Sequence, residues 1–181
     1  MHPVDVNQAL KSMYILVDTR EQRTTRSEQR YSSFGCHWRR QKLNFGDYSA
    51  ETVLASGDVF TLSSCVCIER KLGLDELAHC YCQDRKRFER EFERAKESGA
   101  KVYLLIENGS WEDAYSGKYR SRMSPESLVA SIQAWLARYN CQVIFCRQHT
   151  TGKLIHDILY RELKEALEKH EPDSGEDQGP C

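Results

Sequence analysis

The stretch VCIERKLGLDEL, residues 66–77, decides the predicted fold. It runs an apolar, β-branched segment directly into Glu69, Arg70 and Lys71, and Asp75 follows four residues after the lysine. Three consecutive charges at the end of a buried strand cost desolvation free energy unless a metal ion, a phosphate or each other compensates them. The pattern therefore indicates a charged site at a strand end. The alternative is a solvated strand end, because most charge runs are simply surface.

The sequence on both sides of this stretch alternates between strand-like and helix-like periods. Strands are expected at residues 14–17, 101–107 and 141–146, and two more meet at a hinge over 44–47, where Gly46 allows a tight turn. Helical periods cover residues 74–82, 84–99, 124–140 and 150–170, and a short, weak helix is expected within 22–33. This alternation predicts an α/β fold with a mixed central sheet flanked by helices.

The turn signal ASGDVF, residues 55–60, predicts a β-hairpin formed by residues 48–54 and 59–69. The hairpin would bring Asp47 at its entrance beside Glu69 at its exit. Lys71, two residues after Glu69 on the same strand, would project to the same face. Carboxylates suit Mg²⁺ or Mn²⁺, and a neighbouring lysine can hold the attacking water or favour negative charge developing on phosphorus. With Asp18 at the end of the first strand, these residues are typical of metal-dependent phosphodiester hydrolysis.

The composition is that of an ordinary folded domain. The chain has 181 residues, of which 40% are hydrophobic and 29% charged, so one domain with a sizeable core is expected. The sequence contains no apolar run of 18 residues that could span a membrane. Its first residues lack the pattern of a secretory signal, so a cytoplasmic location is expected.

The net charge of −1 hides an uneven distribution. From Glu165 onward six acids face one base, Lys169, so this end carries −5 and the remainder +4. The acidic end is expected to be disordered. A mildly basic body is compatible with nucleic acid as a partner and does not by itself establish one.

Eight cysteines allow a zinc site or a disulfide framework as alternatives. None of them forms the Cys-x-x-Cys pairs that let two thiolates close on one zinc ion. Reduced, mostly buried thiols are the better interpretation.

Three motifs together resemble the nuclease domain of the XPF family of structure-specific endonucleases. They are VDTRE at 17–21, FGDY at 45–48 and ERKLGLD at 69–75, and the family signature is G-D, a spacer, then E-R-K-x-x-x-D. The resemblance spans residues 14–167 and implies a restriction-endonuclease-like fold. We therefore expect an N-terminal extension at 1–13, a nuclease domain at 14–168 and an acidic tail at 169–181.

The resemblance also implies roles for individual residues. Asp47 and Glu69 would bind Mg²⁺ or Mn²⁺, Lys71 would be the catalytic lysine, and Asp18 would be a further acid near the metal. The same segments place Arg20 and Glu21 in the pocket. Arg70 and Asp75 also match positions of the signature, and more than one role is open for each of them. Arg70 could contact phosphate or pair with Asp75, and Asp75 could act in catalysis or only supply charge at a helix N-terminus.

DNA contacts would come from basic residues that flank the motifs. The predicted DNA-binding residues are Arg23, Arg39, Arg40, Lys42, Arg85, Lys86 and Arg87. Further positive charge comes from Arg26, Arg30, Lys118, Arg120 and Arg122. Phosphate contacts of this kind give strong salt dependence and little sequence preference. For any one of these arginines, the alternative is a solvated surface side chain.

The resemblance leads to a specific functional hypothesis. We expect a Mg²⁺- or Mn²⁺-dependent DNA endonuclease acting at branched, flap or fork DNA in repair or recombination. The alternatives are a nuclease on plain duplex DNA and a non-catalytic DNA-binding or dimerisation subunit. The chain ends without the tandem helix-hairpin-helix motifs usual in the family, so the DNA geometry stays open. A homodimer or heterodimer is implied by resemblance, and the location would be the nucleoid or the nucleus, depending on the cell type.

Overall fold

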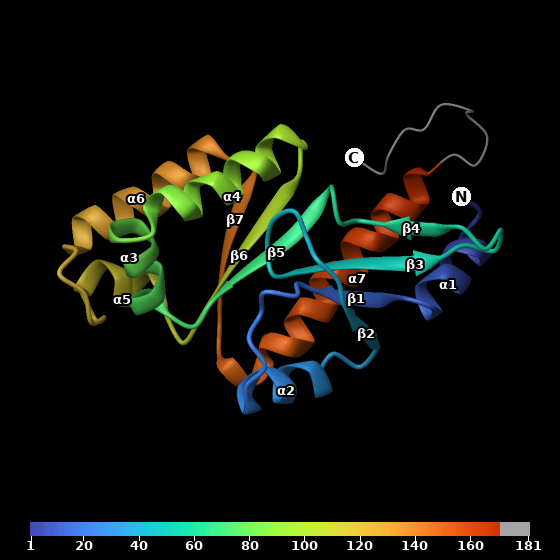
Figure 1. Ribbon diagram of the computed structural model, residues 1–181, viewed down its shortest axis with the longest axis horizontal. Helices are drawn as coiled ribbons and strands as arrows, with labels where there is room; N and C mark the ends of the chain where they lie inside the picture. The colour runs from blue at the N-terminus through green and yellow to red at the C-terminus, as the bar shows by residue number, and fades with distance from the viewer. Residues whose placement is uncertain (171–181) are drawn as a thin grey trace.

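A mixed β-sheet forms the centre of the computed structural model, which describes residues 1–170 (Figure 1). Within these residues the strand order is β2-β1-β3-β5-β6-β7, and β4 pairs with β3. The strands are β1 (Tyr14–Val17), β2 (His37–Arg40), β3 (Tyr48–Val53), β4 (Val59–Thr61), β5 (Val66–Lys71), β6 (Lys101–Glu107) and β7 (Cys141–Cys146). The pairs β1·β2, β5·β6 and β6·β7 are parallel, whereas β3 is antiparallel to β1, β4 and β5. The predicted mixed sheet is confirmed.

Helices cover both faces of this sheet. They are α1 (Pro3–Lys11), α2 (Thr25–Ser32), α3 (Leu74–Cys82), α4 (Arg85–Glu97), α5 (Trp111–Ser116), α6 (Pro125–Arg138) and α7 (Thr151–Lys169). Figure 1 shows α3, α4, α5 and α6 on one side and α1, α2 and α7 on the other. Two apolar cores follow this division, one around α7 and one around Trp135 of α6. Because β6 is covered on both faces, its residues 102–106 form a continuous apolar run, whereas β5 is apolar only up to Ile68 and ends in three charged residues.

Local sequence explains where two of the predicted helices begin. The Ser124 side chain accepts a hydrogen bond from the backbone N–H of Ser127, and Pro125 takes the first position of α6. The expected weak helix within 22–33 is α2, which Thr24 and Ser27 start with reciprocal capping hydrogen bonds.

Two segments differ in detail from what the sequence pattern suggested. The run 59–69 is divided into β4 and β5, and a turn in which Cys65 N donates to Leu62 O separates them. The expected N-terminal extension contains α1, whose Val6, Ala9 and Leu10 are buried in the core around α7. The acidic tail lies outside the described residues, except for its first two positions. Among the helices of residues 1–170, none combines the length and the hydrophobicity of a membrane-spanning segment.

Candidate active site

Several strand ends meet at one edge of the sheet. Because β3 runs antiparallel to β1 and β5, its start lies beside the ends of both. Asp18 N donates to Asp47 O at 2.8 Å, and Asp47 N donates to Ile68 O at 2.8 Å. Gly46 makes the turn into β3 with φ of 71°, a conformation that favours glycine. The topology thus places Asp47 next to the end of β5, as the hairpin prediction required.

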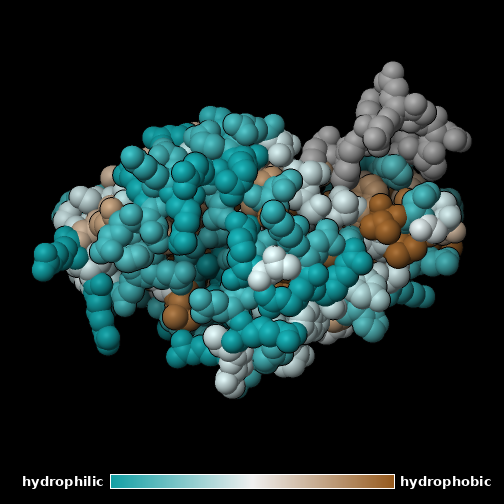
Figure 2. Space-filling view, in the orientation of Figure 1, coloured by the Kyte–Doolittle hydropathy of each residue, from teal (hydrophilic) through white to brown (hydrophobic). Residues whose placement is uncertain are grey.

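A pocket of about 1000 Å³ opens at this edge, between the loop after β1, α2, α3 and α4. Asp47, Glu69, Arg70 and Lys71 lie in its wall. Further lining residues carry positive charge: Arg20, Arg26, Arg30, Arg87, Arg90 and Arg94. Figure 2 shows that hydrophilic side chains dominate the face of the molecule turned toward the viewer. The pocket therefore combines a small acidic centre with a rim of arginines.

Asp47 and Glu69 form the acidic centre. Asp47 is half-buried and its Oδ2 accepts a hydrogen bond from Arg70 N at 2.8 Å, while Glu69 is 5% exposed. Burial raises the pKa of Asp47, and the neighbouring Glu69 raises it further. Burial also raises the pKa of Glu69, against the opposing effect of Lys71. A cation bound to both carboxylates would offset the burial of these two groups and the effect of Glu69 on Asp47.

This pair fits a magnesium-type ion better than a metal that needs a full protein cage. Within residues 1–170 no group of three or more His, Cys, Asp and Glu side chains could hold a metal ion. Mg²⁺, however, is commonly bound through one or two carboxylates, with water and substrate phosphate completing its shell. The donor set of Asp47 and Glu69 therefore fits Mg²⁺ or Mn²⁺ in the presence of a phosphate substrate.

Lys71 completes the centre as a fixed cation. Its Nζ lies 2.6 Å from Glu69 Oε1 and 4.9 Å from the centroid of the Phe88 ring. Burial lowers the pKa of Lys71, but Glu69 and Asp47 outweigh this and hold the pKa above its ordinary value. The side chain is therefore charged at neutral pH and can act as an electrostatic donor rather than as a base.

Asp18 has a different environment from the other two acids. It is 2% exposed, and its oxygens accept hydrogen bonds from Arg20 N, Arg20 Nε and Leu43 N, each at 2.7 Å. Burial raises the pKa of Asp18, but the hydrogen bonds from Arg20 and Leu43 outweigh it and leave the pKa below its usual value. Its side chain does not line the pocket, whereas that of Arg20 does. The contacts of Asp18 thus orient Arg20.

The chain is similar to proteins of known family and fold. The family model of the ERCC4 domain matches residues 17–158, which contain all the strands described except β1's first three residues. The chain belongs to the ERCC4 domain family. This is a family of nucleases, and the resemblance to XPF-type nuclease domains is confirmed. A comparison with curated proteins gives no match.

Two solved structures share the fold. XPF from Aeropyrum pernix matches with a TM-score of 0.57 and 22% identity over 87% of this chain and 62% of that chain. XPF from Aeropyrum pernix in complex with DNA matches with a TM-score of 0.58 and 21% identity over 90% of this chain and 69% of that chain. The ERCC4 domain described here thus spans about two thirds of those proteins.

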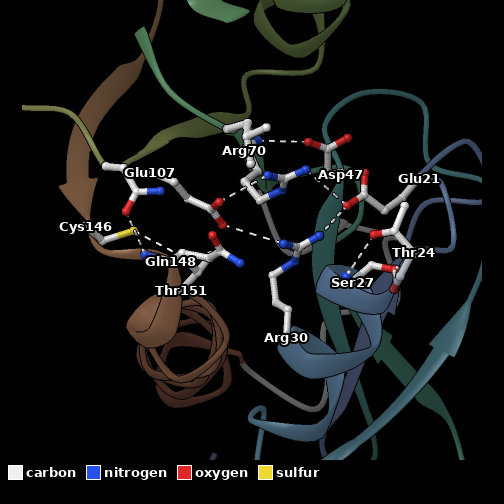
Figure 3. A network of polar contacts seen from close by, with 12 residues as sticks. Glu21, Thr24, Ser27, Arg30, Asp47, Arg70, Glu107, Cys146, Gln148 and Thr151 are labelled. Atoms are coloured by element: carbon white, nitrogen blue, oxygen red, sulfur yellow. Dashed lines mark hydrogen bonds and ion pairs between the residues drawn. The ribbon is translucent and has the colours of Figure 1, made fainter. Parts of the chain in front are cut away.

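Arg70 lies within a set of four alternating charges in this ERCC4 domain, which we call the charge ring: Glu21, Arg30, Glu107 and Arg70 (Figure 3). Glu21 Oε1 is 2.6 Å from Arg30 Nη2 and 3.4 Å from Arg70 Nη2. Glu107 lies between the same two arginines, at 3.5 Å from each. The sequence placed Glu21 and Arg70 in the site but gave no role to Glu107. Arg70 pairs with Glu21 and Glu107, and not with Asp75.

Asp75, the last acid of the signature, does not line the pocket. It is exposed in the first turn of α3, and its Oδ1 accepts a hydrogen bond from Arg120 N at 2.5 Å. Glu76 and Glu91 line the pocket instead. Glu76 Oε1 lies 4.0 Å from Lys71 Nζ, and Glu91 Oε1 lies 3.1 Å from Arg20 Nη1. Sequence reasoning missed both acids, although Glu91 stands at helical spacing with Arg87 and Arg94 on α4.

Of the predicted DNA-binding residues, Arg87 alone lines the pocket among residues 1–170. Arg39 pairs with Glu51, and Arg40 donates to the carbonyl oxygens of Thr19 and Glu21. The others lie on the exposed surface outside the pocket: Arg23, Lys42, Arg85 and Lys86. Their contact with DNA stays a prediction. The arginines that sequence reasoning missed are Arg90 and Arg94 of α4.

Proposed function

We propose that this ERCC4 domain is a divalent-metal-dependent DNA endonuclease that hydrolyses phosphodiester bonds. The observation that carries the proposal is the placement of Asp47, Glu69 and Lys71 together in the wall of an arginine-rimmed pocket. Mg²⁺ or Mn²⁺ held by Asp47 and Glu69 would polarise the scissile phosphoryl group. Lys71 would donate a hydrogen bond to an oxygen that gains negative charge during the reaction. The hydrogen bond from Lys71 Nζ to Glu69 keeps the ammonium group of Lys71 in place.

The arginine rim supports DNA as the substrate. Arg87, Arg90 and Arg94 lie on successive turns of α4 and line the pocket together with Arg20 and Arg26. Such residues neutralise backbone phosphates on either side of a reacting bond and fix its register. A solved structure with the same fold, XPF from Aeropyrum pernix, contains DNA, which supports the same partner here.

We further infer that the substrate is branched DNA, such as a flap or a fork. This part rests on membership of the ERCC4 domain family. A dimer, expected from the same resemblance, and a nucleoid or nuclear location are proposed on that basis too. Light scattering on the purified chain measures the oligomeric state.

The rival hypothesis is a subunit that binds DNA without cutting it. The intact acidic centre argues against it, because Glu69 and Lys71 are buried charges whose desolvation a binding subunit has no reason to bear.

Cleavage assays with labelled flap, fork and duplex DNA in Mg²⁺ or Mn²⁺ distinguish a nuclease from a subunit that only binds DNA. We expect cleavage of flap or fork DNA, and loss of cleavage with retained binding for Asp47→Ala. The matched control is Lys101→Ala. It removes a lysine that is paired with Glu162 at the start of β6, the end of that strand away from the pocket. If no substrate is cut under either metal, the isolated chain is not a nuclease.

A further inference from the structure

Glu107 is a buried charge for which the proposed hydrolysis has no use. It is the last residue of β6 and is 0% exposed. Neither of its carboxylate oxygens has a hydrogen-bond partner among residues 1–170, and the nearest cations are the guanidinium groups of Arg30 and Arg70 at 3.5 Å. The attraction between buried charges often does no more than offset the cost of their desolvation, so a net gain in stability does not explain why a carboxylate stands here. Its position therefore suggests a role in the neighbouring site.

The charge ring places Arg70 between two carboxylates. Nη2 of Arg70 faces Glu21 and its Nη1 faces Glu107, as Figure 3 shows. The contact with Glu107 is loose, since Nη1 and Nε of Arg70 also lack hydrogen-bond partners within residues 1–170. Two positive and two negative charges balance in the ring, so removal of Glu107 alone leaves one uncompensated guanidinium beside the pocket.

Asp47 is the group that this guanidinium would affect. The backbone N–H of Arg70 already donates to Asp47 Oδ2 at 2.8 Å, so the side chain of Arg70 starts next to the metal-binding carboxylate. The Asp47 charge also attracts the Arg70 guanidinium. Arginine and carboxylate form strong, often bidentate pairs, and such a pair would occupy the oxygens that a cation needs.

We propose that Glu107 is a positioning residue that keeps the Arg70 guanidinium in the charge ring and so leaves the Asp47 carboxylate free to bind the divalent cation. The inference rests on the proposed function only for the existence of a metal site at Asp47 and Glu69. It gives the strand end of β6 a role in metal affinity, although Glu107 itself would not touch the metal.

The test is a calorimetric titration of the full chain with Mn²⁺ alone, without DNA. We expect Glu107→Gln to weaken Mn²⁺ binding about 10- to 100-fold, the range typical of residues that orient a metal ligand. The matched control is Glu162→Gln, which removes a carboxylate paired with Lys101 at the other end of β6 and should leave Mn²⁺ affinity unchanged. A purely structural role for Glu107 would lower the melting temperature and leave the affinity as in wild type, and this result would overturn the inference.

A second variant tests whether the effect passes through Arg70. In Glu107→Gln combined with Arg70→Gln, the competing guanidinium is gone while the backbone N–H to Asp47 remains, so Mn²⁺ affinity should return close to the wild-type value. A double variant that binds Mn²⁺ as weakly as Glu107→Gln contradicts the inference, because the loss would then come from the missing negative charge itself.

The remaining outcomes also discriminate. If Glu107→Gln does not fold, Glu107→Asp keeps the charge and withdraws it from Arg70 by one methylene. It should weaken Mn²⁺ binding in the same direction, and unchanged affinity overturns the inference. A wild-type chain that binds Mn²⁺ and cuts no DNA removes the proposed function and leaves this inference standing. A wild-type chain that binds no Mn²⁺ overturns it.

Discussion

Replacing Asp47 by asparagine should stabilise the metal-free protein while abolishing its activity. Asparagine has the same shape and can still accept the hydrogen bond from Arg70 N. It removes a carboxyl group whose pKa is raised by burial and by Glu69, in spite of the attraction from Lys71. The acidic centre thus opposes folding when no cation is present.

The size of the stabilisation expected for Asp47→Asn follows from the raised pKa of Asp47. Each pH unit by which folding raises a carboxyl pKa corresponds to about 1.4 kcal/mol at a pH where the group is ionised. Because Asp47 is only half-buried at an open pocket, we expect a gain of about 1–3 kcal/mol. For a chain of this length about 1 kcal/mol shifts the melting temperature by roughly 2–4 °C, so a gain of about 1–3 kcal/mol corresponds to an increase of about 2–12 °C.

The contribution of Asp47 to the folding stability of the metal-free protein should decrease as pH rises. A raised folded-state pKa means that the folded state binds more protons than the unfolded state above the ordinary value of 3.8, so the stability that Asp47 contributes at acid pH is lost as pH rises. Metal-free wild type should therefore lose more stability between about pH 5 and 8 than Asp47→Asn does.

Thermal unfolding followed by circular dichroism in EDTA measures these differences. The control is Asp157→Asn on α7, because hydrogen bonds from His156 and Lys153 lower the pKa of Asp157 and its neutralisation should not raise the melting temperature. Added Mg²⁺ should then stabilise wild type and not Asp47→Asn, since only the former retains the site. If Asp47→Asn melts at or below the wild-type temperature in EDTA, the ionised Asp47 carboxylate does not destabilise the metal-free protein.

Three further predictions concern other parts of the site. Lys71→Ala should lower the single-turnover cleavage rate by about 10²- to 10³-fold, as expected for loss of a preorganised charge donor, and an unchanged rate would exclude a catalytic lysine. Arg90→Gln with Arg94→Gln should weaken DNA binding and reduce the slope of log affinity against log salt by about two, whereas Lys164→Gln on α7 should leave it unchanged. A slope equal to wild type would place the DNA elsewhere. Gly46→Ala should destabilise the protein in urea unfolding, since the new Cβ would lie 2.7 Å from a side-chain carbon of β5 at a φ of 71°; a wild-type midpoint would show that this turn relaxes freely.

The sequence predicts those features that depend on short-range order along the chain. The apolar runs and their terminal charges place β1 and β6 correctly, and Ser124 with Pro125 marks the start of α6. The turn signal near residue 57 correctly predicts the antiparallel pairing of β3 with the segment that follows it, which is β4, and β5 then continues beside β3 with Ile68 opposite Tyr48, next to Asp47.

Contacts that depend on the order and register of the strands cannot be predicted from these sequence patterns. Glu107 reaches Arg70 only because β6 pairs in parallel with β5 in the register that sets Ile106 opposite Lys71. Asp18 satisfies its oxygens with Arg20, two residues away, and with Leu43 N from a distant loop. A sequence shows an acid at a strand end in both cases, but it does not show which donors the fold brings to that acid.

We expect Asp47 and Glu69 to bind one divalent cation between them. The most direct measurement is anomalous scattering from a crystal of the protein soaked in Mn²⁺. We predict one anomalous peak between the two carboxylates, and its loss in Asp47→Asn. A peak at another group of side chains, or no peak at all beside these two acids, would show that Asp47 and Glu69 do not form the cation site.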